Sequence, residues 1–357
     1  MTQRSPVEVS WFAALCDDDY EFLGVPNPEL ASSWSHCRDI TLAADRNGFD
    51  NILLPSGYAL GIDSVSFAAG VAPLVDNIEL LLAVRMGEMH LPQLARQLAT
   101  IDQMLGGRLT INIISSDIPG QQLESEPRYQ RTREWMQVLR SLLNGESIDF
   151  HGDFVDLELD PPRVRTVSGQ SPPFYFGGFS PAAKDVAAEF ADVFLTWPDT
   201  VASVGETVTE MKALADGYDR SLRFGLRAHM IVRETEDEAL AAAERLVSKL
   251  DDEVGREIKN RSLDTQSAGV ARQNALREAA GDDWFAESNL WTGVGRARSG
   301  AGAAIVGDPE QVVAKLQAYQ DVGVDAFILS GYPHEAECDL VAQHVLPRLN
   351  HGPINWW

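Results

Sequence analysis

Asp325-Ala-Phe-Ile-Leu-Ser-Gly-Tyr-Pro-His334 is the most informative stretch of the sequence. Residues 326–329 form a continuous apolar run, as expected for a parallel strand that is covered on both faces. Polar residues follow at once, and Tyr332 and His334 carry side chains that can exchange protons. Because α/β folds place their chemistry at the carboxyl ends of parallel strands, the stretch predicts a buried strand and a candidate site together.

Seven more apolar runs precede this stretch, and helix-period segments separate most of them. The eight predicted strands span residues 7–13, 51–55, 79–84, 109–114, 173–176, 192–195, 222–232 and 325–329. Repeated strand–helix units with doubly covered parallel strands form either a doubly wound sheet or a closed barrel. Eight strands favour the (β/α)8 TIM barrel, an α/β fold.

Helix boundaries agree with this pattern. Apolar residues from Leu91 to Leu105 lie on one helical face, which Gly106-Gly107 ends. Ser180-Pro181 and Asp308-Pro309 each predict a helix cap followed by proline at the first helical position.

The alternation of strands and helices predicts a single barrel domain over residues 1–357. One segment interrupts this alternation. Residues 251–302 are polar, charged and rich in glycine and alanine, with no strand signal. The segment is too long for an ordinary strand–helix connection, so we expect an insertion over the barrel mouth that acts as a mobile lid.

Composition narrows the possible partners. The 29 Lys and Arg residues against 53 Asp and Glu residues give a net charge of −24, which repels phosphate backbones and anionic lipid. We therefore expect no nucleic-acid partner and no membrane partner. No apolar run is long enough to span a membrane, no signal-peptide core is present, and Cys16, Cys37 and Cys338 lack metal-site spacing. These features predict a soluble cytoplasmic protein with free thiols.

Two candidate sites follow predicted strands in the middle of the chain. In residues 176–181, two glycines allow close approach of a ligand, and Ser180 opens a helix whose free amide groups favour phosphate. An ordinary glycine turn with a capping serine is the alternative. Arg227 and His229 share one face of a strand and would point together into a barrel lumen or mouth. A surface arginine and a core histidine are the alternative there.

Two further candidates lie later in the chain. Residues 293–302 place Arg296 and Arg298 on a glycine-rich segment, which would either clamp an anionic substrate or form a solvated loop. The second candidate is the pair Tyr332 and His334. The sequence holds no GxSxG elbow, Walker loop or HExxH motif, so hydrolase and kinase interpretations lack support.

Six blocks in the same order resemble the bacterial luciferase-like, flavin-dependent monooxygenases, and within them the alkanesulfonate monooxygenase branch. The blocks are residues 174–178, 195–197, 223–235, 289–295, 298–302 and 329–334. The resemblance covers nearly the whole chain and implies a (β/α)8 barrel with insertions. It also implies that a separate NAD(P)H-dependent flavin reductase supplies reduced FMN. With dioxygen as co-substrate, the carbon–sulfur bond of a small organosulfonate would be cleaved to give sulfite and an aldehyde.

The resemblance assigns expected roles to individual residues. The positions that match the catalytic groups are Arg227, His229, Arg298 and Tyr332. The two arginines would hold a sulfonate by charge-assisted hydrogen bonds, with Trp197 and His334 completing the substrate pocket. The positions expected to bind FMN are Asn112, Ser115, Tyr129, Gly178 and Ser180.

The chain departs from that branch at two places near the expected site. The family has a cysteine shortly after the second strand, and residues 56–63 contain none. The first strand of the family ends near a histidine, where this chain has Asp17, Asp18 and Asp19. These carboxylates suggest a hydroxylated or sugar-like sulfonate, whose hydroxyl groups they would bind.

Other functions remain open at this point. One alternative is a luciferase-like monooxygenase that acts on a sulfone, an amine or a natural-product intermediate. Another is a deazaflavin F420-type oxidoreductase or a non-catalytic flavin-binding barrel. We also expect a homo-oligomer, dimer or tetramer. The apolar tail, residues 354–357, would either dock on a neighbouring subunit or fold back on its own domain.

Overall fold

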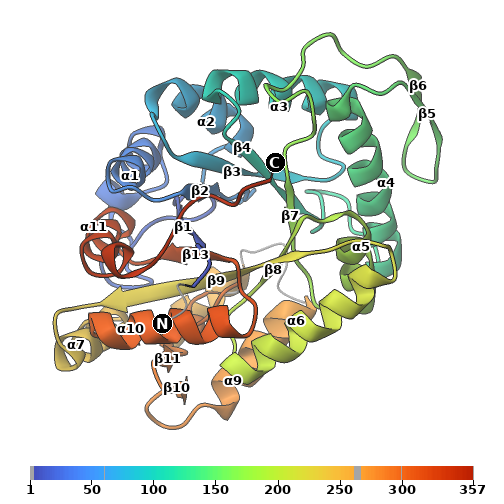
Figure 1. Cartoon of the computed structure of the whole chain (residues 1–357). Coiled ribbons are helices and arrows are strands. Elements are labelled where there is room, and N and C mark those ends of the chain that lie inside the picture. The colour runs from blue at the N-terminus through green and yellow to red at the C-terminus, as the bar shows by residue number, and fades with distance from the viewer. Residues whose placement is uncertain (1–3, 60, 261–266, 299, 357) are drawn as a thin grey trace.

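Eight parallel strands close into a barrel with helices around it, which confirms the predicted fold class (Figure 1). The computed structural model describes residues 4–59, 61–260, 267–298 and 300–356. The barrel order is β1-β2-β3-β4-β7-β8-β9-β13, and the pairing of β13 with β1 completes the ring. In the described part of the chain, no helix combines the length and apolar character that crossing a membrane needs.

All eight predicted strands are present within one or two residues of their expected ends. They are β1 (Glu8–Phe12), β2 (Asn51–Leu54), β3 (Glu79–Arg85), β4 (Leu109–Ile114), β7 (Phe174–Phe176), β8 (Val193–Thr196), β9 (Arg223–Val232) and β13 (Ala326–Ser330). The helices that connect them around the barrel are α1 (Trp34–Arg46), α2 (Ser64–Val71), α3 (Leu91–Leu105), α4 (Ser125–Asn144), α5 (Pro181–Phe190), α6 (Val201–Asp216) and α10 (Pro309–Asp321), and α11 (His334–His344) follows β13. Short 3-10 turns are η1 (Pro28–Leu30), η2 (Ala72–Leu74), η3 (Gly293–Arg296) and η4 (Leu346–Arg348).

The predicted helix ends are also observed. Gly106 ends α3 with a φ of 67°, a left-handed conformation that glycine adopts without a side-chain penalty. The Ser180 hydroxyl accepts a hydrogen bond from the Ala183 amide at the start of α5. Asp308 closes a capping box with Gln311 at the start of α10. The sequence thus sets these boundaries locally.

Residues 251–302 were predicted to lack strands, and this prediction was wrong. The segment between β9 and α10 contains α7 (Glu236–Val247), α8 (Asp252–Asn260), α9 (Ala268–Ala279), β10 (Phe285–Glu287), β11 (Leu290–Trp291) and β12 (Ala304–Gly307). Part of the predicted lid, residues 261–266 and 299, lies outside the described residues. The hairpin of β5 (Ile148–His151) and β6 (Asp156–Leu159) was also missed. Such short strands give little periodic signal, because their pairing partners define them.

Strand β12 brings the inserted segment to the rim of the barrel. The amide of Arg223 donates to Asp192 next to β8, and the amide of His229 donates to Ala303 next to β12. Amides an even number of residues apart in a strand point to the same edge, so β12 continues the β8 edge of β9 beyond the barrel. The chain that leads into β12, including Arg298, is therefore placed beside the carboxyl end of β9.

The C-terminal tail folds back on its own domain rather than being free to dock elsewhere. The ring of Trp356 lies edge-on to Tyr175, with 6.3 Å between centroids, and Ile354 packs on the same inner cluster of the barrel. His351 pairs with Val7 at the amino end of β1. The C-terminus lies over the barrel opening in Figure 1. Trp357 lies outside the described residues.

The amino end of the barrel encloses an acidic group. Both carboxylate oxygens of Glu8 accept hydrogen bonds from the Tyr175 hydroxyl, each at 3.1 Å, and Ser10 donates to one of them. Burial raises the pKa of Glu8 to about 7, and the nearby Asp50 acts in the same direction. Glu8 is therefore protonated in the folded protein at pH values where it is ionised in the unfolded chain.

Replacing Glu8 with glutamine is expected to change how stability depends on pH. A raised folded pKa means that the free energy of unfolding falls as pH rises from about 4.5, the ordinary value, to about 7. The loss amounts to roughly 3 kcal/mol at about 1.4 kcal/mol per pKa unit. Denaturant titrations at about pH 5 and about pH 8 should show that Glu8→Gln removes most of this fall. Equal pH dependence in both proteins would contradict the prediction.

Candidate active site

The predicted arginine, histidine and tyrosine meet at the carboxyl ends of β9 and β13. Arg227 donates to the Ser330 hydroxyl at 2.7 Å, and the same hydroxyl lies 2.8 Å from Nδ1 of His229. The rings of His229 and Tyr332 stack with 5.3 Å between centroids and 24° between planes. Ser330, which the sequence analysis did not single out, thus links the two groups. Its place at the end of the predicted strand was the available signal.

Arg298 reaches the same cluster from the inserted segment. Its Nη1 lies 2.6 Å from Oδ2 of Asp17, which follows β1. Burial by itself lowers the pKa of Arg298. Tyr332, Asp17 and Cys16 together raise the pKa by more than burial lowers it, so the net change is upward. The guanidinium is therefore a fixed positive charge. The prediction that Arg227, His229, Arg298 and Tyr332 gather in space agrees with these contacts.

Burial and mutual repulsion set the charge state of the cluster. Burial, and next to it Arg298, lowers the pKa of Arg227 to about 9. Burial, Arg227 and Arg298 hold the pKa of His229 well below its usual value, so its imidazole is neutral. Burial raises the pKa of Tyr332, so its phenol keeps its proton. Two cations, a neutral imidazole and a protonated phenol form a site that binds an anion and exchanges protons.

His334 joins the cluster through its ring. It lies edge-on to Tyr332 at 5.0 Å between centroids and against the face of Phe12 at 5.9 Å. The Arg227 guanidinium lies over the ring of Phe12, 4.3 Å from its centroid. Nδ1 of His334 contacts Asp19 at 2.7 Å.

The hypothesis that Asp19 binds substrate hydroxyls is wrong. Asp19 is fully buried, and its two oxygens already accept four hydrogen bonds from the protein. Of the other two carboxylates, Asp17 pairs with Arg298, and Asp18 accepts from the Ser32 amide at 2.9 Å. All three are held by the protein, which residue type and position alone did not indicate.

A cavity of about 390 Å³ opens beside this cluster, at the carboxyl ends of β4, β7 and β8. Its lining includes every residue predicted to bind FMN together with two predicted substrate residues: Asn112, Ser115, Tyr129, Gly178, Ser180, Trp197 and Arg227. Ser115 is held by Thr132 at 2.7 Å between hydroxyl oxygens. Gly178 lies so close to α5 that an added Cβ would come within 2.5 Å of the Cβ of Ala183. Arg227 borders both the cavity and the cluster.

One end of the cavity is strongly positive, which the sequence analysis missed. Arg128 and Ser116 line the cavity, and Nε of Arg128 and Oγ of Ser116 are buried without a hydrogen-bond partner among the described residues. Arg85 and Arg131 lie behind them, against the backbone oxygens of Asp117 and Ser116. Burial lowers the pKa of Arg131, and so do Arg128 and Arg85, while Asp117 opposes them. The spacing of Arg128 and Arg131 on one helical face was the available signal.

The inserted segment covers part of this cavity. Residues 267–269, at the start of α9, line it next to Trp197. Gly269 packs so closely that an added Cβ would meet the Trp197 ring at 2.7 Å. Arg296, the other arginine of the predicted clamp, lies away from the cluster and pairs with Asp252 at 2.9 Å. Only Arg298 of the two is thus placed to contact a ligand.

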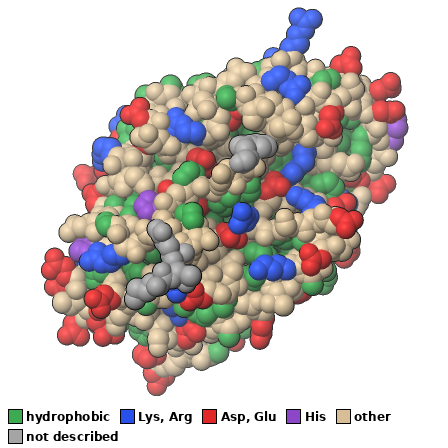
Figure 2. All heavy atoms as spheres, viewed as in Figure 1, with side chains coloured by type: hydrophobic (Ala, Val, Ile, Leu, Met, Phe, Trp, Pro, Cys, Tyr) green, Lys and Arg blue, Asp and Glu red, His purple; other side chains and the backbone are tan. Residues whose placement is uncertain are grey.

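Acidic side chains are frequent on the outer face of the molecule that carries the two termini (Figure 1, Figure 2). They gather along the edge of the face in Figure 2, with basic groups interspersed. The sites of positive charge described above are therefore local exceptions in a chain with a net charge of −24.

Fold and site together define a barrel enzyme with an anion-binding, proton-exchanging centre, and the chain belongs to the luciferase-like monooxygenase family, whose model matches residues 22–326. It is a monooxygenase, and the resemblance found in its sequence is confirmed. The chain is 61% identical over 355 residues to a sulfoquinovose monooxygenase of Novosphingobium aromaticivorans, covering 98% of each. It is 48% identical to a sulfoquinovose monooxygenase of Agrobacterium fabrum, covering 96% of this chain and 89% of the relative.

A solved structure shows the same fold at low sequence identity. A riboflavin lyase, crystallised with modified FMN and riboflavin, superimposes with a TM-score of 0.78 at 14% identity. The match covers 96% of this chain and 91% of the lyase. It supports the barrel architecture alone.

Proposed function

We propose that this protein is a reduced-FMN-dependent monooxygenase that cleaves the carbon–sulfur bond of a sugar sulfonate, with sulfoquinovose as the expected substrate. The observation that carries the proposal is the convergence of Arg227 and Arg298 beside His229 and Tyr332, next to a cavity suited to a flavin. Two fixed guanidinium groups fit an anionic sulfonate. The names of the two relatives at 61% and 48% identity support a sugar sulfonate in particular.

The residues around the cavity fit FMN. The positive end suits a phosphate group: it holds Arg128, Ser180 at the start of α5, and the Ser116 hydroxyl, which finds no hydrogen-bond partner in the described part of the chain. The apolar walls, including Trp197 and Ile328, suit the ring system, and Asn112 supplies a polar group to the lining. When bound, reduced FMN would supply the electrons that activate dioxygen, one oxygen atom passing to the substrate carbon and the other to water.

The chain's own residues would perform the remaining work. Arg227 and Arg298 would hold the sulfonate and so place the carbon that bears it against the flavin. The Tyr332 phenol would donate a proton or hydrogen bond where negative charge develops, and neutral His229 would accept one. Sulfite leaves as the carbon becomes an aldehyde. The inserted segment, with Arg298 and α9, would act as a lid that excludes water.

A sulfite-release assay tests the proposal. The purified chain is supplied with FMN, NADH, a generic flavin reductase and either sulfoquinovose or a plain alkyl sulfonate. We expect oxygen uptake and sulfite release with sulfoquinovose, and at least about tenfold slower turnover of the alkyl compound. Oxygen uptake without sulfite would favour a non-sulfonate substrate. Hydride transfer without oxygen uptake would favour an F420-type enzyme.

The reductase that supplies reduced FMN is expected to be a separate protein that uses NAD(P)H. Self-association into a dimer or tetramer is a further expectation, which sedimentation at several protein concentrations would test.

Replacing Arg128 with alanine is expected to weaken FMN binding by about tenfold or more, because a charge-assisted contact to phosphate is lost. Riboflavin lacks the phosphate, so its affinity should hardly change. Both dissociation constants are measured by flavin fluorescence. Arg133→Ala is the control, since Arg133 lies on the same helix but pairs with Asp185. Equal losses for FMN and riboflavin would place the phosphate elsewhere.

A further inference from the structure

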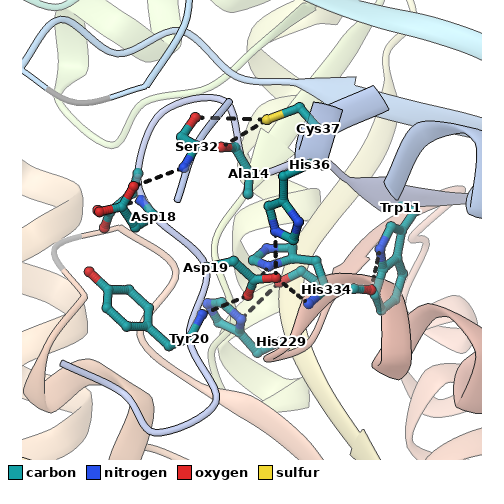
Figure 3. A network of polar contacts seen from close by, with 12 residues as sticks. Trp11, Ala14, Asp18, Asp19, Tyr20, Ser32, His36, Cys37, His229 and His334 are labelled. Carbon is teal, nitrogen blue, oxygen red and sulfur yellow. Dashed lines mark hydrogen bonds and ion pairs between the residues drawn. The ribbon is translucent and has the colours of Figure 1, made fainter. Parts of the chain in front are cut away.

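Asp19 is a fully buried carboxylate surrounded by donors (Figure 3). Oδ1 accepts from the Tyr20 amide at 2.8 Å and contacts Nδ1 of His334 at 2.7 Å. Oδ2 accepts from the His334 amide at 2.8 Å and contacts Nε2 of His36 at 3.1 Å. Burial opposes ionisation, but the interactions with His334 and the hydrogen bond from His36 lower the pKa of Asp19, so the group is an anion that only accepts.

This arrangement fixes which nitrogen of His334 is left to contact a ligand. Because ionised Asp19 accepts hydrogen bonds and donates none, Nδ1 of His334 must carry a hydrogen. The other nitrogen, Nε2, is buried and has no hydrogen-bond partner among the described residues. The ring that carries it lies between Phe12 and Tyr332, within the cluster described above. An orphaned polar atom in such a place is costly unless a ligand completes it.

We propose that Asp19 and His36 are positioning residues for substrate binding: they fix the orientation and tautomer of His334, so that its Nε2 accepts a hydrogen bond from a hydroxyl group of the sugar sulfonate. This inference rests on the proposed function for the nature of the ligand. His36 lies in α1, and its Nε2 must also carry a hydrogen, which gives Asp19 its fourth donor. The first helix of the barrel is thereby linked to the site through one carboxylate. Asp19 itself has no contact with the ligand in this account.

A purely structural role is the competing explanation. Asp19 also accepts from the first amide of α11, whose N-cap residue Pro333 has no capping side chain. In an asparagine at position 19, one oxygen becomes an NH2 group that faces either the Tyr20 amide or the His334 amide. In either orientation the NH2 group faces a backbone N–H, so two donors point at each other. When it faces the Tyr20 amide, it also points at the Nδ1 hydrogen of His334. Stability alone therefore does not separate the two roles.

Kinetics with a matched control separate them. Asp19→Asn is expected to lower kcat/KM by about 10- to 100-fold, mostly through a higher KM for the sulfonate. His36→Ala should show a smaller loss, and His36→Gln, which keeps a donor, should recover much of it. Asp45→Asn is the control, since Asp45 is another carboxylate that accepts several backbone amides, those of Asp76, Asn77 and Ile78, remote from the cluster. It should reduce the melting temperature without raising KM.

A double-mutant cycle gives the decisive comparison. If Asp19 acts through His334, then adding Asp19→Asn to His334→Gln should lower kcat/KM by no more than about twofold beyond His334→Gln alone. If the losses of kcat/KM in the two single variants multiply in the double variant, the proposal is overturned and Asp19 acts only as a helix cap.

Nitrogen-15 NMR of labelled histidines provides a readout that needs no turnover. We expect an Nδ1-protonated ring signal that disappears in both His334→Gln and Asp19→Asn and persists in Asp45→Asn. Its persistence in Asp19→Asn would overturn the proposal even in an active enzyme. Its presence in a wild-type protein that releases no sulfite would instead refute the proposed function and keep the positioning of His334.

Discussion

Arg298→Ala is expected to reduce kcat/KM for sulfite release by about 1,000-fold or more, the largest effect we foresee. The guanidinium is partly buried, with 17% of the side chain exposed, and permanently charged, and it lies beside Arg227 and Tyr332. Its removal deletes half of the positive charge available to a sulfonate. It also leaves Asp17 without its ion-pair partner at the cluster, so an uncompensated carboxylate repels the anion.

Arg296→Ala is the matched control for this variant. Arg296 belongs to the same segment and carries the same charge, but it pairs with Asp252 at the surface. We expect its kinetic constants to stay within about twofold of wild type. Steady-state sulfite assays and FMN binding should be measured for both variants. A modest loss in Arg298→Ala with unchanged KM would show that the substrate needs no second cation.

The second large effect is expected for Tyr332→Phe, which removes one hydroxyl and keeps the ring. Stacking on His229 and the edge contact with His334 should survive, so the fold and KM should change little. We expect kcat to fall by about 100-fold, the usual range for loss of a positioned proton donor. Since burial raises the pKa of Tyr332 above its ordinary value of 10, the phenol stays protonated from about pH 6 to about pH 9. The ratio of wild-type to variant kcat should therefore be constant over that range.

Tyr58→Phe is the control for the second variant, because Tyr58 is a largely exposed tyrosine after β2. It should leave kcat unchanged. A ratio that varies with pH in Tyr332→Phe would indicate that the phenol titrates during turnover. That result would contradict the protonated state assigned to it.

The barrel could be predicted because its signals are local. Each central strand is a short, doubly buried apolar run, and helix ends such as those at Gly106 and Ser180 depend on neighbouring residues alone. The residues of the cluster were also within reach, since Arg227, His229 and Tyr332 stand at the ends of those runs. The carboxyl ends of barrel strands converge whatever the loops do.

The rest depended on contacts between distant segments. Strands β10, β11 and β12 exist because each finds a partner, and only the pairing of β12 with β9 places Arg298 at the rim. Asp19 looked like a ligand for hydroxyl groups, because nothing in its neighbourhood of the sequence reveals that His36 and His334 surround it. The positive end of the cavity likewise unites residues of β3 and α4 with Ser116, which follows β4, and no motif connects them.

The pairing of Arg298 with Asp17 also has a consequence for selectivity among solutes. Asp17 already serves as the counter-ion of Arg298. An incoming anion therefore has to displace Asp17 from Arg298 or share Arg298 with it. Weakly binding ions such as chloride should compete poorly in that exchange, whereas a sulfonate that also engages Arg227 should succeed. The site would then bind the sulfonate somewhat more weakly than two unpaired arginines would, but it would not be occupied by the chloride of the cell.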